Sequence, residues 1–113
     1  MATVSSETIA TDFAWAAGFF DGEGCSYVMK VKQRKYPRLR LCQVDSRPLT
    51  RFVEIIDIGK IRGPYPPTGN QRAAQSEWGV AGKKAQLVMD LLWDHLSEPK
   101  KEQYTRVVLE CQG

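Results

Sequence analysis

The sequence predicts an α+β fold whose helices and strands follow the order αββαββαα. Apolar residues recur at spacings of three and four in four segments, as in helices that bury one side. Two shorter segments carry β-branched and aromatic residues with partial alternation, which is typical of strands. Two more short strands are expected nearer the C-terminus, and glycine and proline separate the segments. A chain of 113 residues is expected to form one domain, 1–113, in which the small, polar residues 1–11 form a flexible arm.

The first predicted helix begins near Asp12, because the side-chain oxygen of Asp12 or Thr11 can accept from free N–H groups of the first turn. One side of this helix carries small or short residues at spacings of three and four: Ala14, Ala17, Gly18, Asp21 and Gly22. This side is nearly bare backbone, so a second helix could approach it closely.

Glu23 is expected at the C-terminus of this helix, because Gly22 and Gly24 are natural points for the chain to leave it. The last carbonyls of a helix have no partner within the helix and carry partial negative charge. Carboxylate and carbonyl oxygens at a negative dipole end suit a hard divalent cation such as Mg²⁺.

The next four elements are predicted from alternation and breaks. Strands are expected over Cys25–Arg34 and Arg38–Val44, joined by a turn at residues 35–37. A helix capped by Asp45 or Ser46 follows and ends at Gly59, and residues 60–62 form a short third strand.

The remaining segments complete the predicted order. A loop rich in glycine and proline leads to a fourth strand over residues 74–81. A third helix is expected over residues 83–96, with these residues inward: Leu87, Val88, Leu91, Leu92 and Leu96. Ser97 then caps a fourth helix with Pro99 in its first turn.

Positive charge is concentrated in one segment. Residues 25–51 hold eight lysines and arginines against Asp45 alone, whereas residues 1–24 hold no basic residue. A basic segment beside an acidic motif is the pattern expected of a protein that binds a phosphate backbone, although a basic run by itself is more often a solvated surface.

Alternation in the second strand places Arg38 and Arg40 on the side opposite Leu39 and Leu41, which are expected in the core. Gln43 and Asp45 then fall on the leucine side, so a β-bulge is expected near Cys42. In the first strand Lys30 and Lys32 share a side, and Tyr27, Met29 and Val31 share the other.

Several classes of site and location are disfavoured. The chain has three cysteines without CxxC spacing and a single histidine, so a zinc site or a Cys–His nucleophile is not expected. No signal peptide or apolar segment long enough to cross a bilayer is present, so the protein is expected to be intracellular, with no membrane partner.

The stretch AAGFFDGEG, residues 16–24, resembles the motif of the LAGLIDADG homing endonucleases. The resemblance implies a saddle-shaped antiparallel sheet, helix contacts through Gly18, a structural role for Asp21, and Glu23 as the ligand of catalytic Mg²⁺ (or Mn²⁺), with the Gly22 carbonyl as a second ligand. The family often places a basic residue near the scissile phosphate, and Lys83 and Lys84 are the candidates here, although a solvent-facing role is as plausible for either. The family pattern also places alternate residues from Cys25, and therefore Tyr27, on the DNA side. Lys30 and Lys32 lie on the other side of the first strand, and they are preferred here over Tyr27 as DNA contacts, so the two interpretations conflict.

With one motif in the chain, the resemblance implies a homodimer that makes a double-strand break in double-stranded DNA at a near-palindromic site. Arg38 and Arg40 are the expected base contacts. The full set of predicted DNA contacts is Lys30, Lys32, Arg34, Lys35, Arg38, Arg40, Gln43 and Arg47. Two alternatives remain: a sequence-specific DNA-binding regulator on the same fold that has lost cleavage, and a small module whose basic hairpin meets acidic protein or RNA.

Overall fold

The computed structural model describes residues 6–113, and the expected arm lies partly outside that range, in residues 1–5. The elements are α1 (Ser6–Glu23), β1 (Cys25–Val31), β2 (Arg34–Gln43), α2 (Arg47–Ile56), β3 (Ile61–Tyr65), β4 (Gln75–Ala81), α3 (Lys83–Leu92), the 3₁₀ turn η1 (Trp93–His95) and α4 (Glu98–Gln112). The predicted order αββαββαα is confirmed. The prediction of a flexible arm is wrong for residues 6–11, which belong to α1. The Thr11 hydroxyl donates to the Glu7 carbonyl at 2.8 Å inside this helix, so Thr11 does not cap its start.

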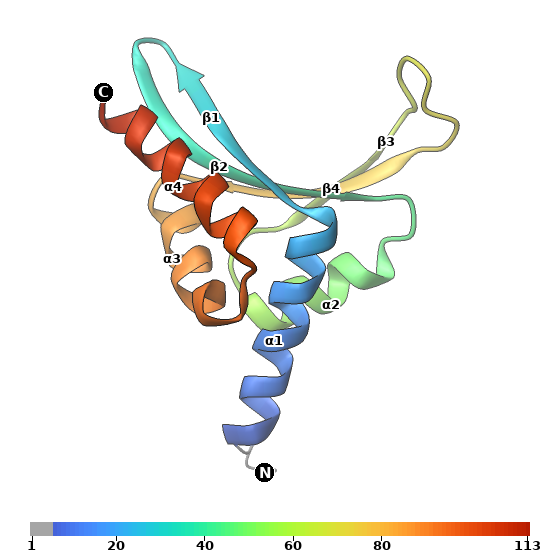
Figure 1. Ribbon diagram of the computed structural model, residues 1–113. Helices are drawn as coiled ribbons and strands as arrows, with labels where there is room; N and C mark the ends of the chain where they lie inside the picture. Colours follow the sequence, from blue (N-terminus) through green and yellow to red (C-terminus); the bar gives the residue numbers. More distant parts are fainter. Residues whose placement is uncertain (1–5) are drawn as a thin grey trace.

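The four strands form one antiparallel sheet in the order β1-β2-β4-β3. Figure 1 shows that the sheet curves, with the β1–β2 hairpin rising at one end and the β3–β4 hairpin at the other. All four helices lie against the convex face, and the concave face is open (Figure 1). The expected saddle is therefore present, with one covered and one open side.

The first hairpin turns earlier than the sequence predicted. Val31 pairs with Arg34, so the turn consists of Lys32 and Gln33, and Lys32 adopts a left-handed backbone with φ 57°. Pro37 lies inside β2, where its carbonyl accepts from the Gly82 N–H at 2.9 Å. The nitrogen of Pro37 points to the same edge, where β4 has already ended, so its missing N–H costs no hydrogen bond of the ladder.

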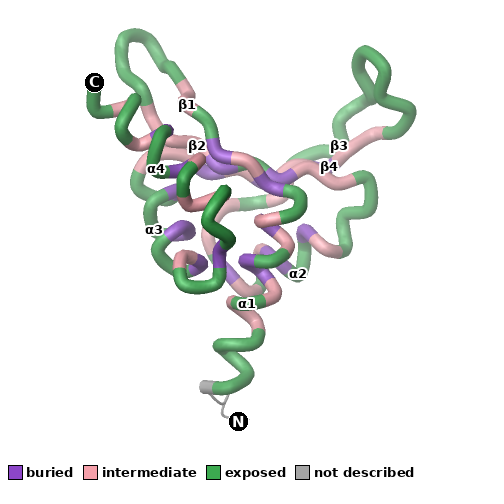
Figure 2. Tube along the Cα trace, viewed as in Figure 1, coloured by how far each residue is buried: buried purple, intermediate pink, exposed green. Residues whose placement is uncertain are grey.

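The core lies between the sheet and the helices, as Figure 2 shows by the buried segments at the centre of the molecule. Leu39 and Leu41 are fully buried, as predicted. Trp78 is fully buried too, and its indole N–H donates to the Ile58 carbonyl at 2.8 Å, so this ring belongs to the core. It meets the ring of Phe52 at 4.8 Å between centroids in an edge-to-face contact.

Two helices differ from their predicted limits or faces. α2 ends at Ile56, before Gly59, because Asp57 takes a left-handed backbone with φ 56° and its N–H caps the Val53 carbonyl. In α3 the expected inward positions Leu87 and Leu91 are wrong, since they are 54% and 40% exposed. The covered side is instead formed by Ala85, Val88, Met89 and Leu92.

No β-bulge interrupts β2, because its pairing with β4 is regular from Arg38 to Gln43. Gln43 is therefore on the leucine side of the strand by plain alternation. The irregularity of the sheet lies in β3, between Arg62 and Tyr65. Among residues 6–113, no helix is both long and apolar enough to traverse a bilayer.

Candidate functional site

Glu23 is the last residue of α1 and is exposed, as predicted from the glycines around it. The helix continues through Gly22, so only Gly24 releases the chain. The Gly24 N–H donates to the Phe20 carbonyl at 2.8 Å, and a Cβ at Gly24 would overlap the buried ring of Phe20. The position of Glu23 is therefore fixed by a tight exit that only glycine can make.

Gln43 lies beside this carboxylate. Its side-chain amide, at the end of β2, donates to Glu23 Oε2 at 3.0 Å. The structure thus brings together two residues predicted for different roles, metal binding and DNA contact. The Gln43 amide therefore holds the Glu23 carboxylate against the end of β2.

Lys100 also reaches the end of α1, a position that the sequence did not indicate. Its ammonium, in the first turn of α4, donates to the Gly24 carbonyl at 2.5 Å and lies 5.9 Å from the centre of the Phe20 ring. Lys100 therefore places a positive charge at the carbonyl of Gly24, the residue that follows Glu23. Its separation of 76 residues from Gly24 left no local sign in the sequence.

Lys83 and Lys84 are not part of this cluster. They begin α3 and are both exposed, directly after Gly82, whose N–H binds the Pro37 carbonyl. Pro37 is six residues before Gln43 on β2, roughly 20 Å along an extended strand.

Asp21 has a role within the chain. Its carboxylate accepts from the Ser97 N–H at 3.1 and 3.2 Å and from the Ser97 hydroxyl at 3.0 Å. Ser97 is the residue before α4, so Asp21 ties the end of α1 to the start of α4. This contact agrees with the structural role implied by the motif, and Asp21 is only half-buried.

The small side of α1 divides into two parts. Ala14, Gly18 and Gly22 are exposed, and a Cβ built at Gly18 or Gly22 meets nothing within 4 Å. Ala17, expected on the same side, has no exposed surface and packs in the chain's own core. The bare stripe of α1 is therefore Ala14, Gly18 and Gly22, without Ala17.

The open face of the sheet carries Arg38 and Arg40, as predicted, but also Tyr27. Register pairs Tyr27 with Arg38 and Cys25 with Arg40, and directly paired residues share a face. Lys30 and Lys35 pair with each other on the opposite, helix-bearing side. Tyr27 therefore shares the face of Arg38 and Arg40, as the family pattern implied, and Lys30 does not. The choice of the lysines over Tyr27 as DNA contacts stays a prediction.

The other predicted basic contacts have separate positions. Arg34 shares the open side at the start of β2, and Lys32 lies in the hairpin turn. Burial of Arg40 lowers the pKa of its guanidinium, but Cys42, Glu77 and Tyr27 raise that pKa more, so the net shift is upward. Arg40 is thus a permanent cation of the open face.

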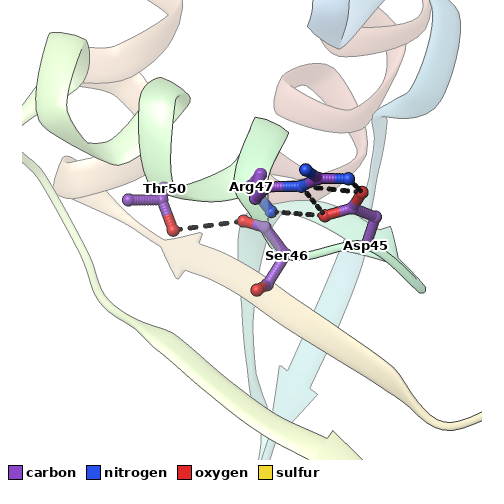
Figure 3. A network of polar contacts seen from close by, with 4 residues as sticks. All are labelled: Asp45, Ser46, Arg47 and Thr50. Carbon is purple, nitrogen blue, oxygen red and sulfur yellow. Dashed lines mark hydrogen bonds and ion pairs between the residues drawn. The ribbon is translucent and has the colours of Figure 1, made fainter.

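Arg47 is held at the start of α2 by Asp45 (Figure 3). The Asp45 carboxylate accepts the Arg47 backbone N–H at 3.0 Å and its guanidinium through Nε at 3.0 Å and Nη2 at 2.5 Å. These bonds lower the pKa of Asp45 to about 2. In the same figure the Thr50 hydroxyl donates to the Ser46 carbonyl at 3.1 Å.

Within residues 6–113, no three His, Cys, Asp or Glu side chains gather into a metal-binding group. The three cysteines are free and only partly buried. Among these residues, a cation at Glu23 therefore finds fewer than three such side chains within a single copy of the chain.

The chain resembles several solved structures, whereas no protein-family model and no curated protein matches its sequence. One is the homing endonuclease I-CvuI in complex with a DNA target, with TM-score 0.71 at 24% identity over 92% of this chain and 68% of that chain. A second I-CvuI complex gives TM-score 0.72 at 24% identity over 95% and 69%. The LAGLIDADG meganuclease I-AabMI bound to uncleaved DNA gives 0.68 at 17% identity over 88% and 36%.

The chain has the LAGLIDADG homing-endonuclease fold. In this fold the motif AAGFFDGEG, residues 16–24, forms the second half of α1 and the exit to β1. The open saddle of this LAGLIDADG fold starts at the same exit, because Cys25 is the first residue of β1. Glu23 thus lies where the motif helix meets the sheet.

Proposed function

We propose that two copies of this chain form a homodimer that cuts double-stranded DNA at a near-palindromic site with the help of a divalent cation. The observation that carries the proposal is the exposed Glu23 at the end of a helix whose neighbouring side, at Gly18 and Gly22, is bare. The similar structures of I-CvuI and I-AabMI are DNA complexes, which supports duplex DNA as the substrate.

The dimer is supported by the bare stripe of Ala14, Gly18 and Gly22. Small residues allow two helix backbones to approach closely, and a twofold axis along this stripe would bring both copies of Glu23 to one centre. Each of the two DNA strands has one scissile phosphate. In this proposal one Glu23 serves each phosphate, so two copies of the chain are needed.

The donor set at the end of α1 fits a hard cation. Glu23 offers carboxylate oxygens and Gly22 a carbonyl at the negative end of the helix dipole, and Mg²⁺ or Mn²⁺ prefers such oxygen ligands. One I-CvuI structure was determined with Mg and the other with Ca. When bound, the cation supplies Lewis acidity that activates water and stabilises charge on the phosphate.

The side chains around Glu23 have distinct roles in this proposal. Gln43 holds the Glu23 carboxylate in position through its amide. Lys100 places an ammonium beside the exit of α1, where it offsets negative charge that develops on a phosphate. We therefore assign to Lys100 the charge-stabilising role first sought at Lys83 and Lys84.

The open face would follow the major groove. Tyr27, Arg38 and Arg40 share that face, and Arg34 extends it toward the hairpin turn. Phosphates would be contacted where the hairpin projects, by Lys32 in the turn and by Lys30 and Lys35 on the side of the sheet that bears the helices. Arg47 would contact a phosphate only after release from Asp45.

Cleavage of a selected site tests the proposal. Bound sites are first selected from a random duplex library, and cutting is then measured with Mg²⁺ and with chelator. Glu23→Gln is expected to bind the site and to lose cutting, whereas the matched variant Glu54→Gln, which removes an exposed carboxylate from α2, keeps both. If the native chain binds its selected site but cuts it with none of the divalent cations tested, the result would support a DNA-binding regulator and contradict the nuclease proposal.

The dimer has its own measurement. Sedimentation of the native chain is expected to give twice the monomer mass, and Gly18→Leu is expected to give the monomer. If the native chain sediments as a monomer both free and bound to its selected site, the proposed homodimer is contradicted.

A further inference from the structure

On the open face one carboxylate serves two arginines. Glu77, in β4, has Oε1 3.2 Å from Arg38 Nη2 and 2.9 Å from Arg40 Nε. The Glu77 side chain is only 18% exposed, compared with 27% for Arg38 and 45% for Arg40. A carboxylate so covered, with two cationic partners, has a defined position on the sheet.

The backbone makes room for this cluster at Gly79. A Cβ at Gly79 would lie 2.7 Å from Arg38 Nη2 and 3.2 Å from Arg38 Cζ. The guanidinium of Arg38 therefore lies across β4 on its way to Glu77. On its other side, Arg38 Nη1 is 4.0 Å from the sulfur of Met29, so Arg38 is enclosed from two strands.

Arg40 is the more exposed member and meets Glu77 through Nε. Guanine offers O6 and N7 to a pair of N–H donors in the major groove. Because Arg40 binds Glu77 through Nε, its two terminal nitrogens can donate to guanine O6 and N7. Glu77 sets the orientation of these nitrogens before DNA binds. Arg38 uses a terminal nitrogen on Glu77 and lacks this arrangement.

We propose that Arg40 reads one guanine in each half-site, that Glu77 is its positioning residue, and that Arg38 serves to neutralise Glu77. The inference rests on the proposed DNA-binding function. Two arginines and one carboxylate carry a net charge of +1, which limits attraction to any phosphate. Without Glu77 both guanidinium groups are free to contact backbone phosphates of any sequence.

The test is a base-substitution scan of the selected site with the full chain. The native chain is expected to prefer guanine at one position per half-site by roughly 5- to 150-fold, the range for a bidentate arginine contact. Arg40→Lys, which keeps the charge and loses the fork, is expected to abolish that preference. Arg38→Lys is expected to leave it within about twofold, because lysine still neutralises Glu77.

Glu77→Gln is the decisive variant. It is expected to weaken the same guanine preference at least fivefold, to raise affinity for random duplex, and to steepen the salt dependence by about one unit per subunit. Glu54→Gln is the matched control for loss of one negative charge and is expected to leave the preference intact. Circular dichroism and the retained binding of random duplex show that Glu77→Gln is folded.

The outcomes separate the two proposals. A chain that binds and cuts DNA with the same guanine preference in Glu77→Gln overturns the positioning role alone. A preference that survives Arg40→Lys overturns the assignment of Arg40. A native chain that binds no duplex overturns this inference together with the proposed function.

Discussion

The two sides of α1 use small residues for opposite purposes. Ala16 and Ala17 have no exposed surface, and Phe20, one turn later, is 1% exposed. Gly18 and Gly22 lie on the other side with open space where a side chain would be. On the covered side a small residue fits a neighbour already present, whereas on the bare side it leaves room for a neighbour that one chain does not contain.

This difference teaches how to separate folding from assembly in one helix. Substitutions on the covered side are expected to change the free energy of unfolding of each subunit. Substitutions on the bare side are expected to change dimerisation and cutting while each subunit remains folded. The following predictions test that division, beginning with the largest effect.

Phe20→Ala is expected to cost about 3–5 kcal/mol of unfolding free energy, because it empties a fully buried ring site. The ring also closes over Gly24, so the exit that positions Glu23 is lost with it. Urea denaturation followed by circular dichroism measures the cost. Glu7→Gln, on the exposed start of the helix, is the control and is expected to change stability little. A loss under 1 kcal/mol for Phe20→Ala would contradict the packing described.

Ala17→Leu and Gly18→Leu form a matched pair of adjacent insertions. Ala17→Leu is expected to destabilise the subunit by about 1–3 kcal/mol through overpacking. Gly18→Leu is expected to leave subunit stability equal or higher, because leucine favours a helix, while dimerisation weakens by roughly 5- to 150-fold for a misfit of similar size. Denaturation and sedimentation of both variants separate the two effects, and equal behaviour of the pair would refute the division of α1.

Asp21→Asn tests a residue that lies between the two sides. It weakens the bonds to the Ser97 N–H and hydroxyl, with an expected cost of about 1 kcal/mol. Hydrogen exchange is expected to rise in the first turn of α4. A loss of dimer without any change at α4 would instead place Asp21 on the bare side, as the sequence first indicated.

The smallest effect concerns Asp45, which precedes α2 and is not part of α1. Because bonds from Arg47 lower its pKa from 3.8 to about 2, the pair contributes stability above pH 4 that is lost as the pH falls from about 4 to about 2. NMR titration of the Asp45 carboxyl carbon measures this pKa, and Arg47→Ala is expected to return it toward 3.8. Dimerisation at neutral pH is expected to be unchanged in this variant, and a change would tie α2 to the dimer.

The sequence predicted the fold because its periodic signals were strong. Alternation correctly placed Leu39 and Leu41 in the core, and the glycines around Glu23 correctly predicted its exposure at a helix end. Ala17 was assigned to the wrong side of its helix, because a small residue fits both a tight core and a bare surface. Only the neighbours, present in three dimensions, distinguish the two.

The errors at the candidate site have a similar cause. Lys30 and Tyr27 lie near a hairpin whose two faces are both partly exposed, so charge gave no guide to which face is open. Lys100 comes to Gly24 only through the packing of α4, far along the chain. Lys83 and Lys84 were chosen from the family resemblance, but they follow Gly82, which bonds to Pro37, six residues before Gln43 on β2.

Two contacts join the end of α1 to the start of α4, from Asp21 to Ser97 and from Lys100 to Gly24. Both Ser97 and Lys100 leave the ribosome long after Glu23 does. A nascent or prematurely terminated polypeptide that stops within α3 contains Glu23 but can form neither of these two contacts.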